Sequence, residues 1–594
     1  MSNKVLLADY NNHGQQQFEY PEQDVYYTGR KLNQDLKHGP IEQRGCQDII
    51  CVILYLSVWA LMIFCAIKSW DTGDASKIYL PYDSQQRQCG RGDLKNYPNI
   101  YIITQSESYC VSDCPGESGV GKELPCYQCS AQTAPYASAQ LLTLCFPTLK
   151  VDEKYQELIS NLVDISGFQR HYADIEETWP IILACAGIAF FMAILLTFLI
   201  RLAAGCIVWG MILIYLLIVG AIGTVAYLQS KGHYQEYRVI DDAQQLEIIA
   251  YVFWSIGGLS LLIILCLAKK ISQAIQVLKT AADFTREEWQ ALFVPVFILI
   301  LVLGFFAYWL IFSAIIYSTS NEINKSQYSP YVELQWDAKT GWQLCLYFFG
   351  LIWNVCFALA LCQFVISSCC CFWYYSHQGY PLSSSILKSF CRGFTTNFGS
   401  LLFGSLILAI VWTIKFILEF FHKQLKNSVQ GDNNALGYAL RCAKYYVSCF
   451  EKFIRFLNQN AYTMMALTGQ SFCNSAYDAF YLILRNATRV AITHGLGELF
   501  EFLGAIFISA SSSFICYLII TKADAYKNNI FNPIAPTLAF ILISYMIGKM
   551  FMNLYGMGVD TLLLCFIVDT EMNKNEGGAK SVPHSLKQYA SELN

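Results

Sequence analysis

Residues 291–317 read ALFVPVFILILVLGFFAYWLIFSAIIY, a run of apolar and aromatic side chains that contains no charged residue. A helix needs about 20 such residues to cross the hydrocarbon core of a bilayer. Because lipid supplies no hydrogen-bonding groups, a run of this kind satisfies its backbone only as a helix. The stretch therefore predicts a membrane-spanning helix.

Eight further runs of similar character lie on both sides of this one. They cover residues 49–67, 181–200, 204–228, 247–268, 343–371, 398–421, 500–521 and 532–556. The whole chain of 594 residues is 55% hydrophobic and only 14% charged, whereas soluble domains carry about 25% charged residues. These observations predict an all-α polytopic membrane protein that uses the lipid bilayer as its solvent. The net charge of −4 excludes a nucleic-acid partner.

Basic residues near the ends of the runs predict the orientation, because cytoplasmic loops carry an excess of lysine and arginine. The flanks expected in the cytoplasm carry Arg30, Lys31, Lys37 and Arg44 before the first run, and Lys269, Lys270, Lys279 and Arg286 after the fourth. The loop 320–341 then lies outside. Its Asn324 begins the sequon Asn-Lys-Ser and is a candidate glycosylation site.

Nine crossings would leave the two ends of the chain on opposite sides of the membrane. Segment 422–460 is nevertheless strongly basic. A tenth crossing or a re-entrant helix within residues 434–470 would resolve this conflict. We therefore expect about ten transmembrane helices, with a large cysteine-rich external loop between the first two.

The loop 70–180 contains six of the chain's 24 cysteines: Cys89, Cys110, Cys114, Cys126, Cys129 and Cys145. Such a cluster in an oxidising compartment predicts a disulfide framework. A zinc site built from Cys110 and Cys114 with Cys126 and Cys129 is the alternative, because their spacing is loosely compatible with one. The expected external location favours disulfides, and the sequence does not determine their pairing.

Six segments, in order along the chain, resemble the choline transporter-like family of solute carriers. They are RGCQDI at 44–49, YDS at 82–84 with Cys89-Gly90, GLIW at 350–353, GSLLFGSLI at 399–407, the block 449–480, and DTEMN at 569–573. In some relatives a carboxylate follows the tryptophan of the third segment, where this chain has Cys356.

The resemblance implies a membrane transporter for choline or a related small organic cation, working by alternating access as a facilitator or a proton exchanger. It also implies a multi-pass protein of the plasma membrane, with an organellar membrane, including the mitochondrial one, as the alternative. A non-transporting structural subunit with partners in a larger membrane complex and a lipid scramblase or channel are the competing functions.

The corresponding domain organisation has five parts. They are a disordered cytoplasmic tail (1–48), the first transmembrane helix (49–69), the external disulfide-rich loop (70–180), the transmembrane transporter core (181–568) and a cytoplasmic C-terminal tail (569–594).

Aromatic faces in the spans are candidate ligands for an organic cation, since each cation–π contact contributes roughly 0.5–2 kcal/mol. The candidates are Trp353, Trp254, Trp209 and Tyr308, together with Trp309, Trp412 and Tyr215. Interfacial belts and helix packing are the ordinary explanation for such residues. Trp353 is preferred because it lies in mid-span within a family segment.

Ionisable residues in spans are costly and therefore mark functional candidates. Glu498 is the candidate carboxylate for the substrate. Lys415 and Glu419, four residues apart, are expected to pair with each other, and Lys549 requires a counter-ion nearby.

The remaining chemistry-bearing residues suggest neither an enzyme nor a cofactor. The eight histidines are scattered, His494 is expected to be structural, and neither a catalytic constellation nor a metal cluster is apparent. No phosphate-binding loop is present, which argues against an ATP-driven pump. The cysteine trio 369–371 suits palmitoylation or helix packing equally well.

Overall fold

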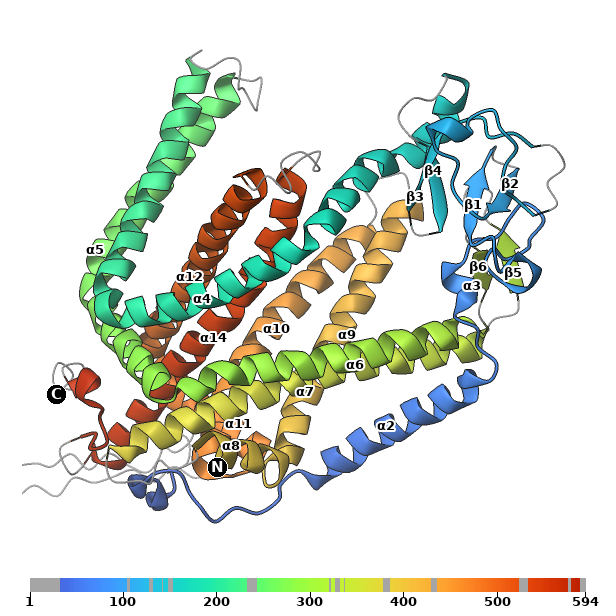
Figure 1. The fold of residues 1–594 in the computed structure, drawn as a ribbon. Helices are drawn as coiled ribbons and strands as arrows, with labels where there is room; N and C mark the ends of the chain where they lie inside the picture. The colour runs from blue at the N-terminus through green and yellow to red at the C-terminus, as the bar shows by residue number, and fades with distance from the viewer. Residues whose placement is uncertain are drawn as a thin grey trace, which may run out of the picture.

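Long helices dominate the computed structural model. It describes residues 32–103, 107–127, 132–141, 143–147, 153–231, 243–319, 322–325, 332–335, 337–377, 385–428, 435–522, 533–574 and 578–587. The long helices are α2 (Ile49–Trp70), α4 (Glu153–Ser230), α5 (Ala243–Glu287), α6 (Phe293–Tyr317), α7 (Ala338–Ser376), α9 (Phe398–Ser428), α10 (Ala435–Thr468), α12 (Ala487–Lys522) and α14 (Ile534–Met572). Figure 1 shows them as one elongated assembly.

The shorter elements connect or cap these helices. They are the helices α3 (Ser76–Tyr79), α8 (Ser385–Phe394) and α11 (Phe472–Arg485), and the 3₁₀ turns η2 (Gln34–His38), η3 (Gly92–Leu94), η4 (Glu117–Gly119), η6 (Trp289–Leu292) and η8 (His584–Leu586).

Within the described residues, nine stretches are long and apolar enough to cross a membrane. They coincide with the nine runs predicted from the sequence, so the prediction of a helical multi-pass protein is confirmed. Two of the runs, 181–200 and 204–228, lie in the single helix α4. Figure 1 shows α4 changing direction between them before it pairs with α5.

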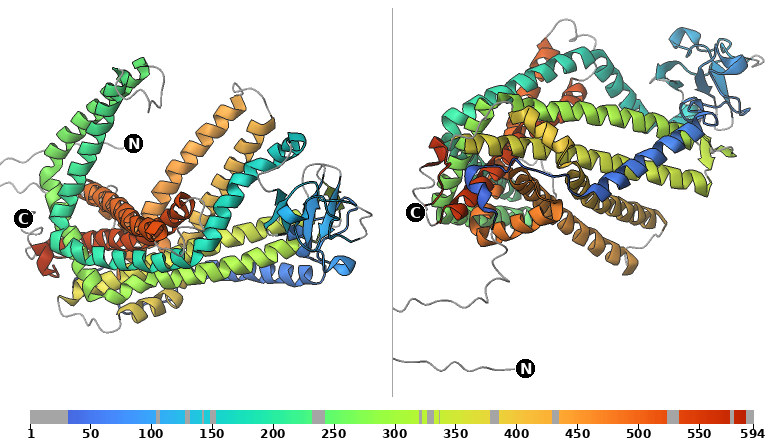
Figure 2. Two further views of the ribbon diagram at one scale, coloured as in Figure 1. Left: turned by 45° about the horizontal axis from the view of Figure 1, so that its top comes forward. Right: turned by 90° about the horizontal axis from the view of Figure 1, so that it is seen from below.

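A further helix that is long enough to cross a bilayer is α10, which the apolar pattern alone does not reveal. It is a continuous helix of 34 residues, longer than the roughly 20 needed to cross a bilayer. It lies beside α9, as the two views in Figure 2 also show. Residues 434–470, where a hidden crossing or re-entrant helix was expected, are thus largely occupied by one long helix.

The burial of the spans separates a centre from a periphery. In the most apolar part of α14, 83% of the residues are buried, and in α7 72%, whereas the value for α5 is 6%. Helices α7 and α14 are therefore central, while the hairpin of α5 and the second half of α4 stands outside them with its apolar side chains exposed. Exposed apolar surface is what a lipid environment favours.

The cysteine-rich loop forms a small sheet module at one end of the assembly (Figure 1). Its strands are β1 (Asn99–Ile102), β2 (Ser108–Val111), β3 (Ser138–Leu141) and β4 (Leu144–Pro147), in the order β2-β1-β4-β3. β1 pairs antiparallel with β2 and parallel with β4, and β3 pairs antiparallel with β4. The hairpin of β5 (Glu322–Lys325) and β6 (Val332–Gln335) lies close to this module in the same view.

Disulfides link the segments of the module. Cys89 is bonded to Cys110, and Cys114 to Cys145. Cys126 is also disulfide-bonded, while Cys129 lies outside the described residues. The expected disulfide framework between the first two spans is confirmed, and a zinc site at Cys110 and Cys114 is excluded because both sulfurs are in disulfides.

Polar contacts organise the chain where α2 leads into the module. Asp74 accepts hydrogen bonds from Ser76 and forms an ion pair with Arg91. Burial alone would raise the pKa of Asp74, but the hydrogen bonds from Ser76 and Arg91 outweigh it and hold this pKa below its ordinary value.

The segment before α2 is folded onto the helix bundle. Arg44 donates from Nη1 to the carbonyl oxygen of Met465 at 3.1 Å. Asp48 Oδ2 accepts from Ser400 Oγ at 2.6 Å and from the backbone N–H of Phe472 at 3.0 Å. The expectation of a disordered tail over 1–48 therefore does not extend to residues 32–48, and residues 1–31 lie outside the described part.

The start of the C-terminal tail is also held in place. Asp569 Oδ2 accepts from Tyr374 Oη at 3.1 Å and from the backbone N–H of Ser581 at 2.8 Å, and Oδ1 accepts from Asn573 at 2.8 Å. Leu586 is buried in the main hydrophobic core. The family-like segments at 44–49 and 569–573 thus anchor the two ends of the chain to the bundle.

The cysteine trio of α7 is completely buried. Cys369, Cys370 and Cys371 are each 0% exposed, and Cys371 Sγ lies 3.5 Å from the Sγ of Cys565 on α14. These thiols are inaccessible to a lipidating enzyme in this structure. Of the two sequence interpretations, helix packing fits the structure and palmitoylation does not.

Candidate functional site: a polar cavity in the helix bundle

A cavity of about 250 Å³ lies between helices α7, α9, α10, α12 and α14. Its lining mixes apolar side chains with charged and amide groups, which is unusual inside a membrane bundle because polar groups there are costly. Every helix in contact with the cavity belongs to a predicted span or to α10. The cavity is therefore the candidate site for a polar substrate.

His494 and Asp560 form the polar link between α12 and α14. His494 Nδ1 lies 2.9 Å from Asp560 Oδ2, and the same carboxylate oxygen accepts a hydrogen bond from Gln459 Nε2 at 2.8 Å. Three helices, α10, α12 and α14, thus meet at one carboxylate. His494, expected to be structural, lines the cavity.

Glu501 and Lys549 form a second link between the same two helices. Lys549 Nζ lies 2.7 Å from Glu501 Oε1, so the counter-ion expected for Lys549 is present. A methyl group at Gly556 would lie 2.9 Å from Glu501 Oε2, which is too close for an unshifted contact. The glycine makes room for the carboxylate.

Glu451 on α10 gathers three donors beside the cavity. It lies 2.7 Å from Lys415 Nζ and 2.6 Å from Arg455, and it accepts from Trp412 Nε1 at 3.1 Å. The expected pairing of Lys415 with Glu419 is wrong, because Lys415 turns toward the buried Glu451. Glu419 pairs instead with Lys444 of α10 at 2.9 Å.

The charges that line the cavity do not balance. Three carboxylates (Glu498, Glu501 and Asp560) face two basic side chains (Arg455 and Lys549). The carboxylates thus outnumber the permanently charged basic side chains, and His494, which lies against Asp560 and Glu498, is the third basic group of the lining. A site of this kind attracts a monovalent cation and repels an anion.

Glu498 differs from the other two carboxylates in its partners. Its contact is with His494 Nε2 at 3.5 Å, and its side chain is 71% exposed. Glu501 is held by Lys549, and Asp560 by His494 and Gln459. Glu498 is thus the carboxylate whose oxygens are the most available to an incoming cation.

Two aromatic residues and several amides also line the cavity. Trp412 and Tyr462 both face the cavity, and Tyr462 is 2% exposed. The guanidinium of Arg455 lies over the Trp412 ring, 5.6 Å from its centroid. Asn458 donates from Nδ2 to the carbonyl of Gly404 at 3.0 Å, while its buried Oδ1 has no hydrogen-bond partner among the described residues.

Trp353, the preferred aromatic candidate, does not line this cavity. It is 1% exposed, donates from Nε1 to Ser405 Oγ at 3.2 Å, and contacts the Tyr55 ring edge-on at 5.2 Å. Its neighbours come from α2, α7 and α9, so it serves the packing of these three helices.

The other aromatic candidates are scattered over the bundle. Trp254 packs against Tyr227 in the α4–α5 hairpin, at 5.4 Å between ring centroids. Tyr308 stacks on Trp59 of α2 at 5.9 Å. Trp209 is 40% exposed on α4. Of the predicted substrate-binding residues, only Glu498 lines the cavity, with Trp412 among the wider set of aromatic candidates.

The glycosylation candidate is far from this site in the fold. Asn324 lies in strand β5, close to the disulfide module in Figure 1. Its side chain lies outside the described part of the structure.

Sequence reasoning missed the contribution of α10 to the cavity. Arg455, Asn458, Gln459 and Tyr462 occur at spacings of three, one and three residues, which place them on one face of a helix. Treating 434–470 as one amphipathic helix would have identified this polar face. The hydropathy pattern alone could not, because a span with a paired polar face scores as a poor span.

Comparison with known proteins agrees with the membrane fold. A family model described as plasma-membrane choline transporter matches residues 251–571, more than half of the chain, and includes every helix that lines the cavity. Choline transporter-like protein 2 of Dictyostelium discoideum is 27% identical over 607 aligned positions, covering 93% of this chain and 95% of the relative.

Two vertebrate relatives give the same result. Choline transporter-like protein 2 of Homo sapiens is 27% identical over 700 positions, covering 96% of this chain and 97% of its own. Choline transporter-like protein 4 of Sus scrofa is 27% identical over 671 positions, covering 90% and 92%. The similarity therefore includes the first span, the cysteine-rich loop and the helix bundle.

Proposed function

Because this chain belongs to the plasma-membrane choline transporter family, we propose that it carries choline or a closely related small organic cation across the membrane through the polar cavity. The relatives are named as choline transporter-like proteins. The proposal places the substrate in the polar cavity, whose charged lining and volume of about 250 Å³ suit a small cation.

The observation that carries the proposal is the unbalanced charge of the cavity. Three carboxylates face two permanently charged basic side chains, so a monovalent cation would balance the lining when the imidazole of His494 is neutral. A cation bound in the cavity would be attracted by these carboxylates. Glu498, with its exposed oxygens, is the carboxylate we assign to the ammonium group.

The remaining lining suits the rest of a choline molecule. A quaternary ammonium group cannot donate hydrogen bonds and is bound by aromatic faces, which Trp412 and Tyr462 provide. A hydroxyl group can donate, and the unpartnered Oδ1 of Asn458 is an acceptor for it. Binding the hydroxyl there would satisfy a buried polar atom.

The polar links across the cavity supply a route for alternating access. The contacts of Asp560 with His494 and Gln459 join α14 to α12 and α10. A cation that competes for these carboxylates weakens the links, and the helices they join can then separate on one side. Facilitated transport and exchange for protons both fit this scheme, and an imposed pH gradient distinguishes them.

The direct test is uptake of radiolabelled choline into proteoliposomes that contain the purified protein. Glu498→Gln keeps the size of the side chain and removes its charge, so we expect KM to rise about tenfold, the loss of one charge-assisted contact. Glu419→Gln is the matched control, since Glu419 pairs with Lys444 outside the cavity, and its KM should stay near that of the wild type.

Two results would overturn the proposal. Equal KM values for the Glu498→Gln variant and the wild type would remove Glu498 from the site. An absence of choline uptake by monodisperse wild-type protein would refute choline transport and favour the structural-subunit alternative.

A further inference from the structure

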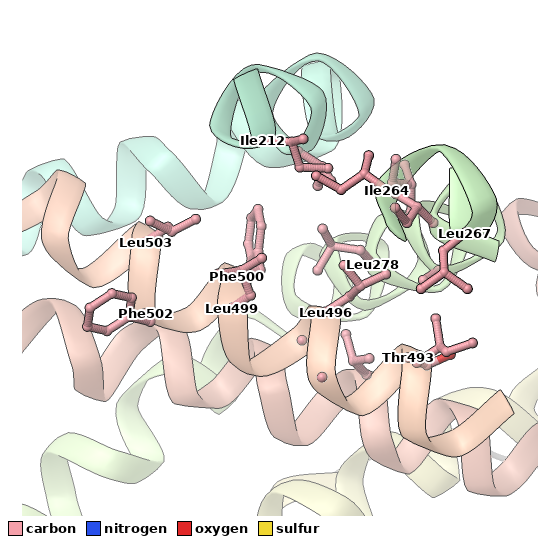
Figure 3. A pocket seen from close by; sticks show the side chains of 18 of the residues that line it. Ile212, Ile264, Leu267, Leu278, Thr493, Leu496, Leu499, Phe500, Phe502 and Leu503 are labelled. Carbon is pink, nitrogen blue, oxygen red and sulfur yellow. The ribbon is translucent and has the colours of Figure 1, made fainter. Parts of the chain in front are cut away.

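A second, larger hollow lies on the other side of α12. It has a volume of about 660 Å³ and is lined by α4, α5, α12 and Val559 of α14. Figure 3 shows the apolar side chains that converge on it, with Leu267 and Thr493 at one end and Leu503 at the other. We call it the apolar groove. Its volume is within the roughly 300–1,000 Å³ of small-ligand sites.

The groove is apolar almost throughout. Its two hydroxyl side chains on α4 and α5, Tyr215 and Ser260, lie 3.2 Å apart and hydrogen-bond to each other. Little is left in the lining to hold water. Since three of its walls are candidate membrane spans, the medium that reaches it is the hydrocarbon of the bilayer, and an acyl chain is the molecule of that medium.

Two basic residues flank the groove. Lys270 follows Leu267 by three residues on α5 and precedes Ala274 by four, and both neighbours line the groove. Arg489 precedes Thr493 by four residues on α12. Helical spacings of three and four place residues on one face, so each basic side chain continues the face of its helix that forms the groove.

Neither basic residue is neutralised by the protein. Lys270 and Arg489 are both exposed, and neither forms an ion pair within the described part of the chain. Lys270 belongs to the flank that the charge distribution assigns to the cytoplasm, where membrane lipids are anionic. Two positive charges beside the groove match the phosphate of one lipid, and the apolar lining matches its acyl chain.

We propose that the apolar groove binds an acyl chain of an anionic phospholipid whose headgroup lies between Lys270 and Arg489. The lipid would lie directly behind the polar cavity, because Gly497 lines both hollows. On α12, His494, Glu498 and Glu501 line the cavity. Thr493, Leu496 and Phe500, which lie on the same turns of this helix, line the groove. The inference does not depend on the transport of choline, since it concerns a different ligand and a different face of α12.

Photo-crosslinking tests the acyl-chain part of the proposal. The protein is reconstituted in bilayers with phosphatidylglycerol that carries a diazirine in one acyl chain, and labelled peptides are mapped. We expect label on residues 260–278 and 491–503. Leu267→Trp fills the groove and should reduce this label about tenfold, whereas Leu265→Trp, on the lipid-exposed side of the same helix, should leave it unchanged.

The headgroup part is tested with two adjacent lysines that lie on different faces of α5. The wild type should prefer the phosphatidylglycerol probe over a phosphatidylcholine probe by roughly thirtyfold, from two basic side chains. The double variant Lys270→Gln/Arg489→Gln should lose this preference. Lys269→Gln should retain it, because a step of one residue turns the side chain by about 100° away from the groove face. These polar substitutions at exposed positions leave the fold intact.

The outcomes that contradict the proposal are equally definite. Equal labelling of Leu267→Trp and the wild type would show that the lipid lies outside the groove. Equal labelling by the two probes would remove the anionic headgroup. Choline uptake is measured on the same preparations, so a failure of lipid binding is distinguishable from a failure of transport.

Discussion

Glu498 and Glu501 are three residues apart on α12, yet the structure gives them different roles. Glu501 is 7% exposed and bonded to Lys549, so its charge is compensated inside the bundle. Glu498 has a longer contact, with His494 Nε2 at 3.5 Å, and its side chain is 71% exposed. At the scale of single residues, the site depends on which carboxylate is already neutralised.

Gly556→Ala tests the compensation of Glu501. The added methyl group would lie 2.9 Å from Glu501 Oε2 and would push the carboxylate away from Lys549. We expect the free energy of unfolding to fall by about 1–3 kcal/mol, the cost of a buried polar group that loses its partner. Thermal unfolding in detergent measures this change.

Gly558→Ala is the control for this variant. Its methyl group would meet Ala281 and Phe284 at 3.7 Å, an ordinary contact. Alanine is favoured over glycine in a helix by about 0.5–1 kcal/mol, so this variant should be as stable as the wild type or more so. Equal destabilisation by both substitutions would show that the effect comes from the helix and not from Glu501.

The sequence predicted which chemical groups need partners in the spans better than it predicted the direction in which each side chain points. Lys549 required a counter-ion, and Glu501 is there. Trp353 and Trp412 are both span-borne tryptophans, but one is sealed among α2, α7 and α9 while the other faces the cavity. Which way a side chain points in a span depends on the neighbouring helices, and a single sequence does not contain their arrangement.

Among the helices, α10 shows why a hydropathy pattern can miss a long helix of the bundle. Its polar residues Glu451, Arg455 and Gln459 lie along one face at intervals of four residues and are paired inside the bundle. Hydropathy averages these residues with the apolar ones and underestimates the span. Charge parity indicated a hidden helix, because it counts crossings and does not depend on composition.

The disulfide module is the element whose stability depends most on covalent links. Cys114–Cys145 closes a loop with a sequence separation of 31, a link worth about 3–4 kcal/mol by chain entropy. Cys114→Ser/Cys145→Ser should therefore make the module sensitive to limited proteolysis. Digestion under native conditions measures this, with Cys391→Ser, an exposed free cysteine, as the control.

Choline uptake by the same disulfide variant shows how far this effect reaches. The cavity is lined by α7, α9, α10, α12 and α14 and by no residue of the module. We expect protease-sensitive protein that still transports. Unchanged proteolysis would mean that hydrogen bonding and packing hold the module without this bond.

At the scale of the whole molecule, the N-terminal segment ties together helices that are distant in sequence. Asp48 bonds to Ser400 at the start of α9 and to the backbone of Phe472 at the start of α11. Asp48→Ala leaves both donors without this acceptor, and we expect a loss of about 1–3 kcal/mol in the free energy of unfolding. Thermal unfolding checks it.

Asp35→Ala is the matched control for Asp48→Ala. Asp35 is an exposed carboxylate of the same segment, in η2, so its removal should change stability by less than about 0.5 kcal/mol. If the two variants unfold at the same temperature, the segment does not clamp the bundle. The family-like motif at 44–49 would then require another explanation.

The membrane-spanning runs and the cysteine-rich loop could be predicted from the sequence, but the way in which these parts pack together could not. Nine runs and a cysteine-rich loop follow from composition, because lipid and an oxidising compartment impose strong constraints on sequence. The position of α4–α5 outside the bundle, and the meeting of Arg44 with the carbonyl of Met465, depend on contacts between residues hundreds of positions apart. No local pattern encodes these contacts.

The ion pairs of Glu451 have a consequence for how the protein is made. As α10 leaves the ribosome, its Glu451 and Arg455 would have to enter the bilayer at a cost of about 2.5–3.5 kcal/mol per charge at the centre. Lys415, which compensates Glu451, lies on α9, the helix synthesised just before it. We therefore expect the insertion machinery to retain α9 until α10 emerges and to release the two together as a hairpin.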